Sequence, residues 1–173
     1  SAGAIGALLH TKHIETILSP SAKKTLIADS PGLHFGDTFW ERFGQDARDS
    51  YQRSFSELGL NIDFNDGFVA RKIGPVLDSL KSWEIGFLYG ERDIIMSEYF
   101  GLISKAEHQQ LLLGPEGIVE TSKNYSNIKV WLSDSENHIF LLFEDKYNSK
   151  STDGVTAIEF VKEIHEFAGK SQL

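Results

Sequence analysis

The sequence contains no cysteine, one methionine and four prolines. The absence of cysteine excludes disulfide bonds, thiolate catalysis and cysteine metal sites together, and it fits a reducing cytosol. No apolar run approaches the roughly 18 residues that a membrane span needs. The apolar start, residues 2–9, has neither a basic segment before it nor a cleavage pattern, so it does not predict a signal peptide. We therefore expect a cytoplasmic protein.

Basic residues are also scarce. The chain has 17 Lys and Arg residues against 25 Asp and Glu residues, which gives a net charge of −8. A surface that binds nucleic acid without sequence preference needs Lys and Arg to displace counterions from the phosphates. An acidic surface instead keeps a protein soluble and attracts a basic partner. We therefore expect little nucleic-acid binding, and a basic protein is the favoured partner.

The motifs of several enzyme classes are missing. The serines have no G-x-S-x-G context, and the glycines form neither G-x-G-x-x-G nor a phosphate-binding P-loop. His10 and His13 are closely spaced but lack an H-E-x-x-H motif. We predict no metal and no cofactor, and we interpret all histidines as surface or capping residues, including the isolated His34, His108, His138 and His165.

What is present predicts one ordered domain. The 173 residues include 12 Phe and 3 Trp, which indicate a core rich in aromatic rings. Apolar residues recur at helical spacing over residues 3–18 and 37–58, and Pro20 is placed to begin a short helix through residue 28. We therefore expect residues 1–58 to be a helical segment.

Residues 59–173 carry the strand patterns. Residues 60–64 and 68–73 flank an Asn-Asp-Gly turn and predict a β-hairpin, while residues 84–89 predict a further strand. A capping box predicts a helix over residues 104–113. The fold class is then α+β, with a helical N-terminal third followed by a mixed, largely antiparallel sheet on which helices pack.

The most legible stretch is the C-terminal one. Residues 128–133 alternate between polar and apolar, and residues 139–143 are continuously apolar, as in a central strand covered on both faces. They predict a second hairpin, which is followed by a helix that Asp153 caps and that ends at Gly169.

One arrangement of residues in that stretch is typical of a catalytic site. Asp134 precedes the predicted strand 139–143, and Glu144-Asp145-Lys146 ends it, so Glu144 and Lys146 share one strand face. These positions resemble Mg²⁺-dependent nucleases of the PD-(D/E)xK type. The resemblance implies Asp134 and Glu144 as metal ligands and Lys146 beside the attacking water. The chain departs from the family pattern because no proline precedes Asp134 and because Asp145 stands where an apolar residue is usual.

The leading hypothesis is nevertheless a non-enzymatic, acidic partner-binding protein. It would be a bacterial immunity or inhibitor protein that neutralises a basic toxin, such as a nuclease, by masking its active site. Trp131 either anchors that interface or packs under the final helix, and the second interpretation is slightly favoured. A third alternative is a small-ligand binding domain with its ligand between helix and sheet. The candidate partner-binding residues are Glu41, Asp46, Asp49, Asp63, Asp66, Glu144, Asp145 and Trp131.

Overall fold

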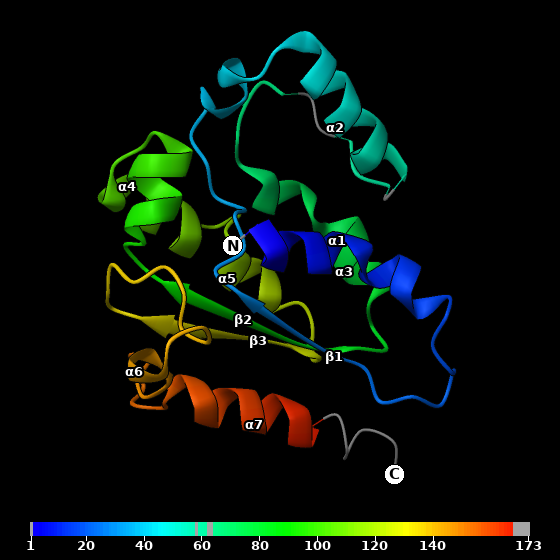
Figure 1. Ribbon diagram of the computed structural model, residues 1–173, viewed down its shortest axis with the longest axis vertical. Helices are drawn as coiled ribbons and strands as arrows, with labels where there is room; N and C mark the ends of the chain where they lie inside the picture. The colour runs from blue at the N-terminus through cyan, green and yellow to red at the C-terminus, as the bar shows by residue number, and fades with distance from the viewer. Residues whose placement is uncertain (1, 58, 62–63, 168–173) are drawn as a thin grey trace.

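A parallel three-stranded sheet forms the centre of the molecule (Figure 1). The computed structural model describes residues 2–57, 59–61 and 64–167. The strand order is β1-β2-β3, and β2 pairs with both neighbours in parallel register. All residues of β2 after Glu84 are buried, so β2 is the central strand and is covered on both faces. The strands are β1 Thr25–Asp29, β2 Glu84–Gly90 and β3 Ile128–Ser133.

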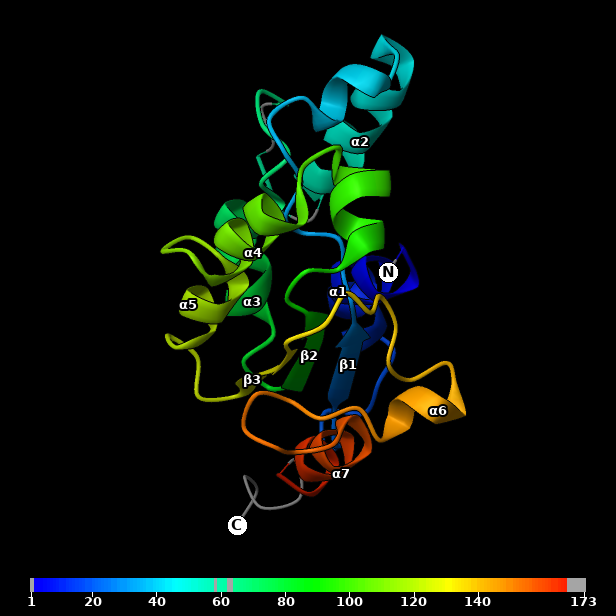
Figure 2. The same ribbon diagram turned by 90° about the vertical axis from the view of Figure 1, so that its left-hand side faces the viewer.

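Helices cover both faces of this sheet. Helices α1 (Ala2–Glu15), α3 (Gly74–Ser79) and α5 (Ile118–Ser122) lie on one face, and α7 (Ala157–Phe167) crosses the other (Figures 1 and 2). Three layers, helix, sheet and helix, result. The remaining elements are η1 Phe39–Arg42, α2 Gln45–Glu57, η2 Val69–Lys72, the π-helical η3 Ile95–Gly101, α4 Lys105–Leu113 and α6 Glu144–Tyr147.

The prediction of a mixed, largely antiparallel sheet is wrong, because all three strands run in the same direction. The helix predicted over residues 20–28 is also wrong, since its second half is the edge strand β1. In β1, Leu26 and Ala28 are buried, while Thr25, Ile27 and Asp29 are half-buried. This alternation is the two-residue period of a strand. The N-terminal third is therefore not purely helical.

The two predicted hairpins are wrong as well. Residues 139–143 form a loop without strand pairing, so no second hairpin forms after β3. In the first predicted hairpin, residues 69–72 form η2, and residues 62 and 63 lie outside the described residues. The Asp66 carboxylate accepts the backbone N–H of Phe68 at 2.8 Å, and this local turn replaces pairing between strands.

The long helix predicted over residues 37–58 is divided in two. Phe43 has extended backbone angles, φ −100° and ψ 133°, and it separates η1 from α2. The aromatic rings on either side of this break pack against one another, with Trp40 and Phe43 centroids 5.7 Å apart and Trp40 and Tyr51 centroids 5.5 Å apart. The break therefore folds a predicted core stripe back on itself.

Other predictions are confirmed. The predicted strands at 84–89 and 128–133 correspond to β2 and β3, and Ser104 caps α4 by accepting the Glu107 N–H at 3.1 Å. The final helix is also present, but Thr156 rather than Asp153 caps it, and its predicted end at Gly169 lies outside the described residues. The Glu159 carboxylate accepts the Thr156 N–H at 2.9 Å, and the Thr156 hydroxyl accepts the Glu159 N–H at 3.3 Å.

The sheet face under α7 holds a small hydrophobic cluster of its own. Trp131 is buried there, and its indole N–H donates to the Val155 carbonyl at 2.9 Å. A Cβ on Gly86 would lie 3.0 Å from Ile164 and Phe160, so the missing side chain lets α7 approach β2 closely. Within the described residues, no helix has the length and apolar character that a membrane crossing requires.

Candidate functional site

The carboxyl ends of the three strands meet at one edge of the sheet. Ser30 follows β1, the turn at residues 91–93 follows β2, and a loop over residues 134–143 follows β3. In open parallel sheets, ligands bind in the crevice outside this edge. The side chains that converge there are therefore the first candidates for function.

Asp93 and His138 form a pair at this edge. The Asp93 side chain is fully buried, and one carboxylate oxygen accepts the backbone N–H groups of Ile95 and Met96, both at 2.9 Å. The other oxygen lies 2.7 Å from Nδ1 of His138. Three hydrogen bonds therefore fix the carboxylate at the start of η3, and the carboxylate in turn fixes the imidazole.

The loop that carries His138 is held to both neighbouring strand ends. The N–H of Arg92 donates to Ser135 at 3.1 Å, on the β2 side. On the β1 side, the Asp29 carboxylate accepts the backbone N–H of Phe140 at 2.9 Å and that of Leu141 at 2.8 Å. Burial raises the pKa of Asp29, although these two amides act in the opposite direction. The loop is therefore anchored by backbone groups and not by its own secondary structure.

Ser30 supplies a further anchor. It is fully buried, and its hydroxyl donates to the backbone carbonyl of His138. Its φ of 53° lies in the left-handed region, which is strained for a residue with a side chain and persists where the surroundings hold it. Gly90 completes the support, because a Cβ there would meet the Asn137 carbonyl at 2.3 Å. The loop therefore lies directly on the end of β2.

The hydrogen bond to Asp93 determines the chemistry of the His138 ring. A carboxylate only accepts hydrogen bonds, so Nδ1 carries the proton and Nε2 of the neutral ring is an acceptor. Among the residues described, none hydrogen-bonds to Nε2, and the side chain is 13% exposed. Nε2 is therefore left without a partner among the described residues, on a ring whose orientation Asp93 fixes.

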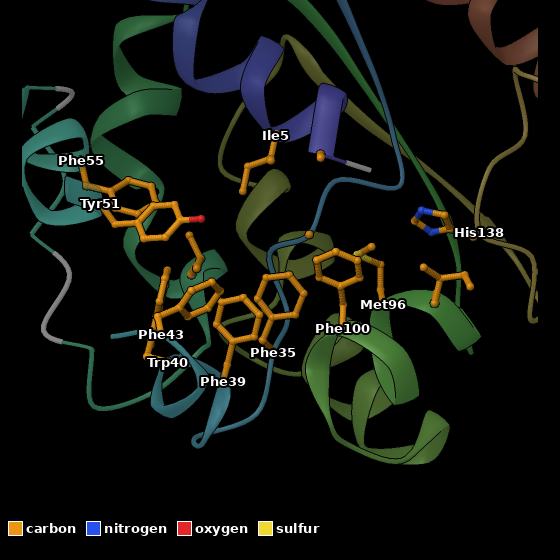
Figure 3. A pocket seen from close by; sticks show the side chains of 14 residues that line it. Ile5, Phe35, Phe39, Trp40, Phe43, Tyr51, Phe55, Met96, Phe100 and His138 are labelled. Atoms are coloured by element: carbon orange, nitrogen blue, oxygen red, sulfur yellow. The ribbon is translucent and has the colours of Figure 1, made fainter. Parts of the chain in front are cut away.

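His138 lies at one end of an apolar pocket (Figure 3). The pocket has a volume of about 230 Å³, and Tyr51 and Phe55 lie at the end opposite His138. Apart from the Tyr51 phenol and the His138 imidazole, its described lining is apolar or aromatic. The lining residues are Ala2, Ile5, Gly32, Phe35, Phe39, Trp40, Phe43, Tyr51, Phe55, Val69, Ile95, Met96, Phe100 and His138.

The walls of the pocket come from distant parts of the chain. Phe35 and Phe39 stack with centroids 4.0 Å apart, and the Trp40 indole N–H donates to the Asp66 carbonyl at 2.9 Å. These contacts fix the rings of the β1–α2 segment, while α1 and η3 supply the opposite walls. Phe100 and Tyr51 remain 48% and 41% exposed, so large rings border the opening. Such rings indicate a binding surface rather than a sealed core.

Two other histidines lie behind this edge, inside the core. Burial lowers the pKa of His34 well below its usual value, and it also lowers the pKa of His108. Nε2 of His34 accepts the Ile118 N–H at 3.3 Å, and the two imidazole centroids are 6.0 Å apart. Nδ1 of His34 and the Tyr89 hydroxyl have no hydrogen-bond partner in the described chain. Both imidazoles are therefore neutral packing groups, in contrast to the surface position that the sequence predicted.

The three residues that resemble a nuclease motif take no part in the Asp93–His138 pair. Asp134 is exposed and pairs with Arg92 at 2.8 Å. Glu144 and Lys146 lie on the helical turn α6, and the Lys146 ammonium sits 5.6 Å from the Phe143 ring centroid. The strand on which the resemblance rests is therefore absent. No group of three or more His, Asp or Glu side chains suited to a metal ion occurs among the described residues.

The predicted partner-binding residues do not form one surface. Glu41, Asp46 and Asp49 are exposed on η1 and α2, whereas Glu144 and Asp145 are exposed on α6, at the other end of the molecule in both views (Figures 1 and 2). Of the remaining three residues, Asp66 and Trp131 do not extend either group. Asp66 pairs with Arg71 at 3.3 Å and Lys72 at 3.9 Å, Trp131 is buried under α7, and Asp63 lies outside the described residues.

Sequence reasoning missed both members of the Asp93–His138 pair. The two residues are 45 positions apart, and neither belongs to a local motif. The usable signal was that each follows a strand, because the carboxyl ends of parallel strands meet at one edge. Comparison with known proteins finds no matching family model, no similar curated protein and no similar solved structure. The site must therefore be interpreted from its own chemistry.

Proposed function

We propose that this protein binds a small amphipathic molecule in the pocket beside His138. The observation that carries the proposal is the position of the oriented His138 side chain at one end of a cavity whose described lining is otherwise apolar or aromatic. Ligand sites commonly combine a mostly apolar lining with a few fixed polar groups. The apolar lining supplies affinity, and the polar group orients the ligand.

The cavity limits the size of the ligand. A volume of about 230 Å³ lies below the roughly 300–1,000 Å³ of pockets for drug-sized molecules. A single short alkyl chain or one ring suits this space. Phe35 and Phe39 offer flat apolar walls, and the exposed Phe100 and Tyr51 would lose contact with water when a ligand enters.

His138 limits the chemistry of the head group. Because Nε2 is an acceptor, the ligand should end in a hydrogen-bond donor such as a hydroxyl. A carboxylate would gain no hydrogen bond from Nε2 of the neutral imidazole. We therefore favour an uncharged molecule with an apolar chain and a hydroxyl at one end.

A series of primary alcohols from butanol to decanol tests the proposal. Trp40 lines the pocket, so its fluorescence reports binding, and calorimetry measures affinity independently. Each added methylene should contribute about 0.8 kcal/mol, or roughly a fourfold gain in affinity, until the chain no longer fits. An affinity that is independent of chain length would contradict binding in this pocket.

Two substitutions on the same helix provide a matched control. Ile5 lines the pocket from α1, and Ile5→Trp would fill part of the cavity. Ile14 is 40% exposed on the same helix and does not line the pocket. We expect Ile5→Trp to abolish the chain-length dependence and Ile14→Trp to preserve it.

Binding of a basic protein partner is a second proposal. Its support is the net charge of −8 together with the exposure of Glu41, Asp46 and Asp49 on η1 and α2. A toxin-like basic partner would be attracted by these carboxylates, and its affinity should fall as salt screens them. Exchanging the three for Gln and Asn should weaken a salt-sensitive complex, while exchange of Glu144 and Asp145 on α6 should not. Equal effects of both exchanges would contradict an interface at α2.

A further inference from the structure

We propose that Asp93 and His138 form a general-base pair that hydrolyses a small carboxylic ester held in the pocket. The inference rests on the proposed ligand binding, and it adds a reaction to it. The ester's apolar part would occupy the cavity, and its carbonyl carbon would lie at the end where His138 stands. His138 is the catalytic residue, and Asp93 is the positioning residue.

The pair is organised before any ligand arrives. Asp93 has one oxygen on two backbone N–H groups and the other on His138, so its orientation is fixed from both sides. Ser30 fixes the backbone of His138 through the carbonyl group. A structural role alone would require neither a ring nitrogen without a partner nor a ring that lines a pocket. Nε2 nevertheless has no partner among the described residues, and His138 lines the cavity.

The reaction balances with water as the only co-reactant. Nε2 takes a proton from a water molecule while the water oxygen bonds to the ester carbonyl carbon, which gives a tetrahedral intermediate. The intermediate then breaks its bond to the alcohol oxygen, and the imidazolium returns the proton to that leaving oxygen. The products are a carboxylic acid and an alcohol, and the imidazole is restored. Asp93 keeps Nδ1 protonated and stabilises the imidazolium throughout.

Gly32 adds a backbone amide to the lining of the same pocket. Gly32 is buried and lines the pocket, and its N–H donates no hydrogen bond to any residue that the structure describes. Buried backbone donors without a partner are rare, so this amide calls for an external acceptor. A Cβ at Gly32 would meet Phe35 at 2.5 Å, so the position excludes a side chain.

Water is a better nucleophile than Ser30 in this arrangement. Ser30 is fully buried and does not line the pocket, and its hydroxyl donates to a carbonyl oxygen rather than to the imidazole. The proposal therefore predicts no acyl-enzyme. A covalent acyl group found on Ser30 by mass spectrometry during turnover would overturn the water route.

The test uses p-nitrophenyl esters from acetate to decanoate as probes. The wild-type chain should hydrolyse them above the uncatalysed rate, with kcat/KM rising with acyl length and then falling. His138→Gln should lower kcat by about 10²–10⁴-fold. His165→Gln, on the exposed side of α7, is the matched control and should keep the wild-type rate. Wild-type and His138→Gln rates that are equal would overturn the proposal.

Asp93→Asn separates positioning from structure. The Asn oxygen can still accept the Ile95 and Met96 amides, but its NH₂ group would face Nδ1 and move the ring proton to Nε2. We expect kcat to fall at least about 100-fold while KM stays near the wild-type value. If Asp93→Asn does not fold, His138→Ala replaces it, and added imidazole should restore part of the lost rate. Equal changes in kcat and KM, or no rescue, would contradict the assigned roles.

Failure of this inference differs from failure of the proposed binding. If octanol binds both the wild type and His138→Gln but no probe is hydrolysed, the proposed ligand binding stands and the proposed hydrolysis is wrong. No chain-length-dependent binding of alcohols would remove the ligand site and the inference together.

Discussion

The carboxyl edge of the sheet and the α6 region contain similar residue types in very different settings. At the edge, Asp93 is fully buried, has three hydrogen bonds and meets a histidine 45 positions away. Asp134, Glu144 and Lys146 are close in sequence, yet Asp134 is exposed and pairs with Arg92 directly after β3, while the other two lie on the helical turn α6. The comparison teaches that spacing along the chain identifies a site only when the predicted secondary structure is right.

The largest expected effect comes from removing the Asp93 carboxylate. Asp93→Ala leaves two backbone N–H groups and His138 Nδ1 without their acceptor in a buried position. Each buried donor that loses its acceptor costs about 1–3 kcal/mol, so we expect the free energy of unfolding to fall by at least about 3 kcal/mol. Chemical denaturation measures this change. A loss below about 1 kcal/mol would mean that the Asp93–His138 pair contributes no more to stability than the exposed Asp134–Arg92 pair.

A glycine substitution tests how tightly the His138 loop lies on the strand end. Gly90→Ala places a Cβ 2.3 Å from the Asn137 carbonyl, so the loop must move. Overpacking of this kind costs about 1–3 kcal/mol, and we expect alcohol binding to weaken as well. Gly44→Ala is the control, since a Cβ there meets nothing within 4 Å. Equal stability of the two variants would contradict a close contact between the loop and β2.

The buried imidazoles predict a pH dependence. The folded-state pKa values of His34 and His108 lie below about 6.5, the ordinary histidine value, so the unfolded chain binds more protons as the pH falls. Stability should therefore decrease from about pH 6.5 downward, by up to roughly 1.4 kcal/mol per pH unit for each imidazole. Denaturation at pH 7 and pH 5 measures the slope, and His34→Gln should reduce it. A slope that His34→Gln leaves unchanged would assign the effect to other groups.

The smallest effect is expected at the exposed Asp134–Arg92 pair. The Asp134–Arg92 pair is largely exposed, with side chains 63% and 39% accessible. Asp134→Ala should therefore lower the free energy of unfolding by about 0–1 kcal/mol, and it should leave alcohol binding unchanged. Denaturation beside Asp93→Ala gives the direct contrast. A loss near 3 kcal/mol would place Asp134 among the fixed groups of the edge.

The parts of the fold that could be predicted are those with strong local signals. Residues 128–133 alternate in the manner of a strand, and Ser104 and Glu107 have the spacing of a capping box. The strand β1 was missed because it has only five residues and follows Pro20 and two lysines, a pattern that equally suits a helix. Without β1, the parallel order of the sheet could not be derived.

The pocket and the Asp93–His138 pair could not be predicted either, because they depend on how distant segments of the chain pack. Phe39, Phe43 and Phe55 have helical spacing and suit a continuous core stripe, but the extended residue Phe43 breaks the helix and turns the rings toward a cavity. His138 directly precedes an apolar run that suits a central strand, yet the run is a loop that the Asp29 carboxylate anchors. Both features depend on tertiary contacts between distant segments, which periodicity does not contain.

The most direct test of the account is a long-range ¹H–¹⁵N NMR spectrum of the imidazole nitrogens, recorded with and without octanol. We expect the His138 proton on Nδ1 in the free protein, and we expect octanol to shift the Nε2 resonance saturably in the wild type but not in Ile5→Trp. Two results would contradict the assignment of His138 as the oriented acceptor of the pocket. One is a ring proton on Nε2 in place of Nδ1 in the free protein, and the other is an Nε2 resonance that does not shift when octanol is added.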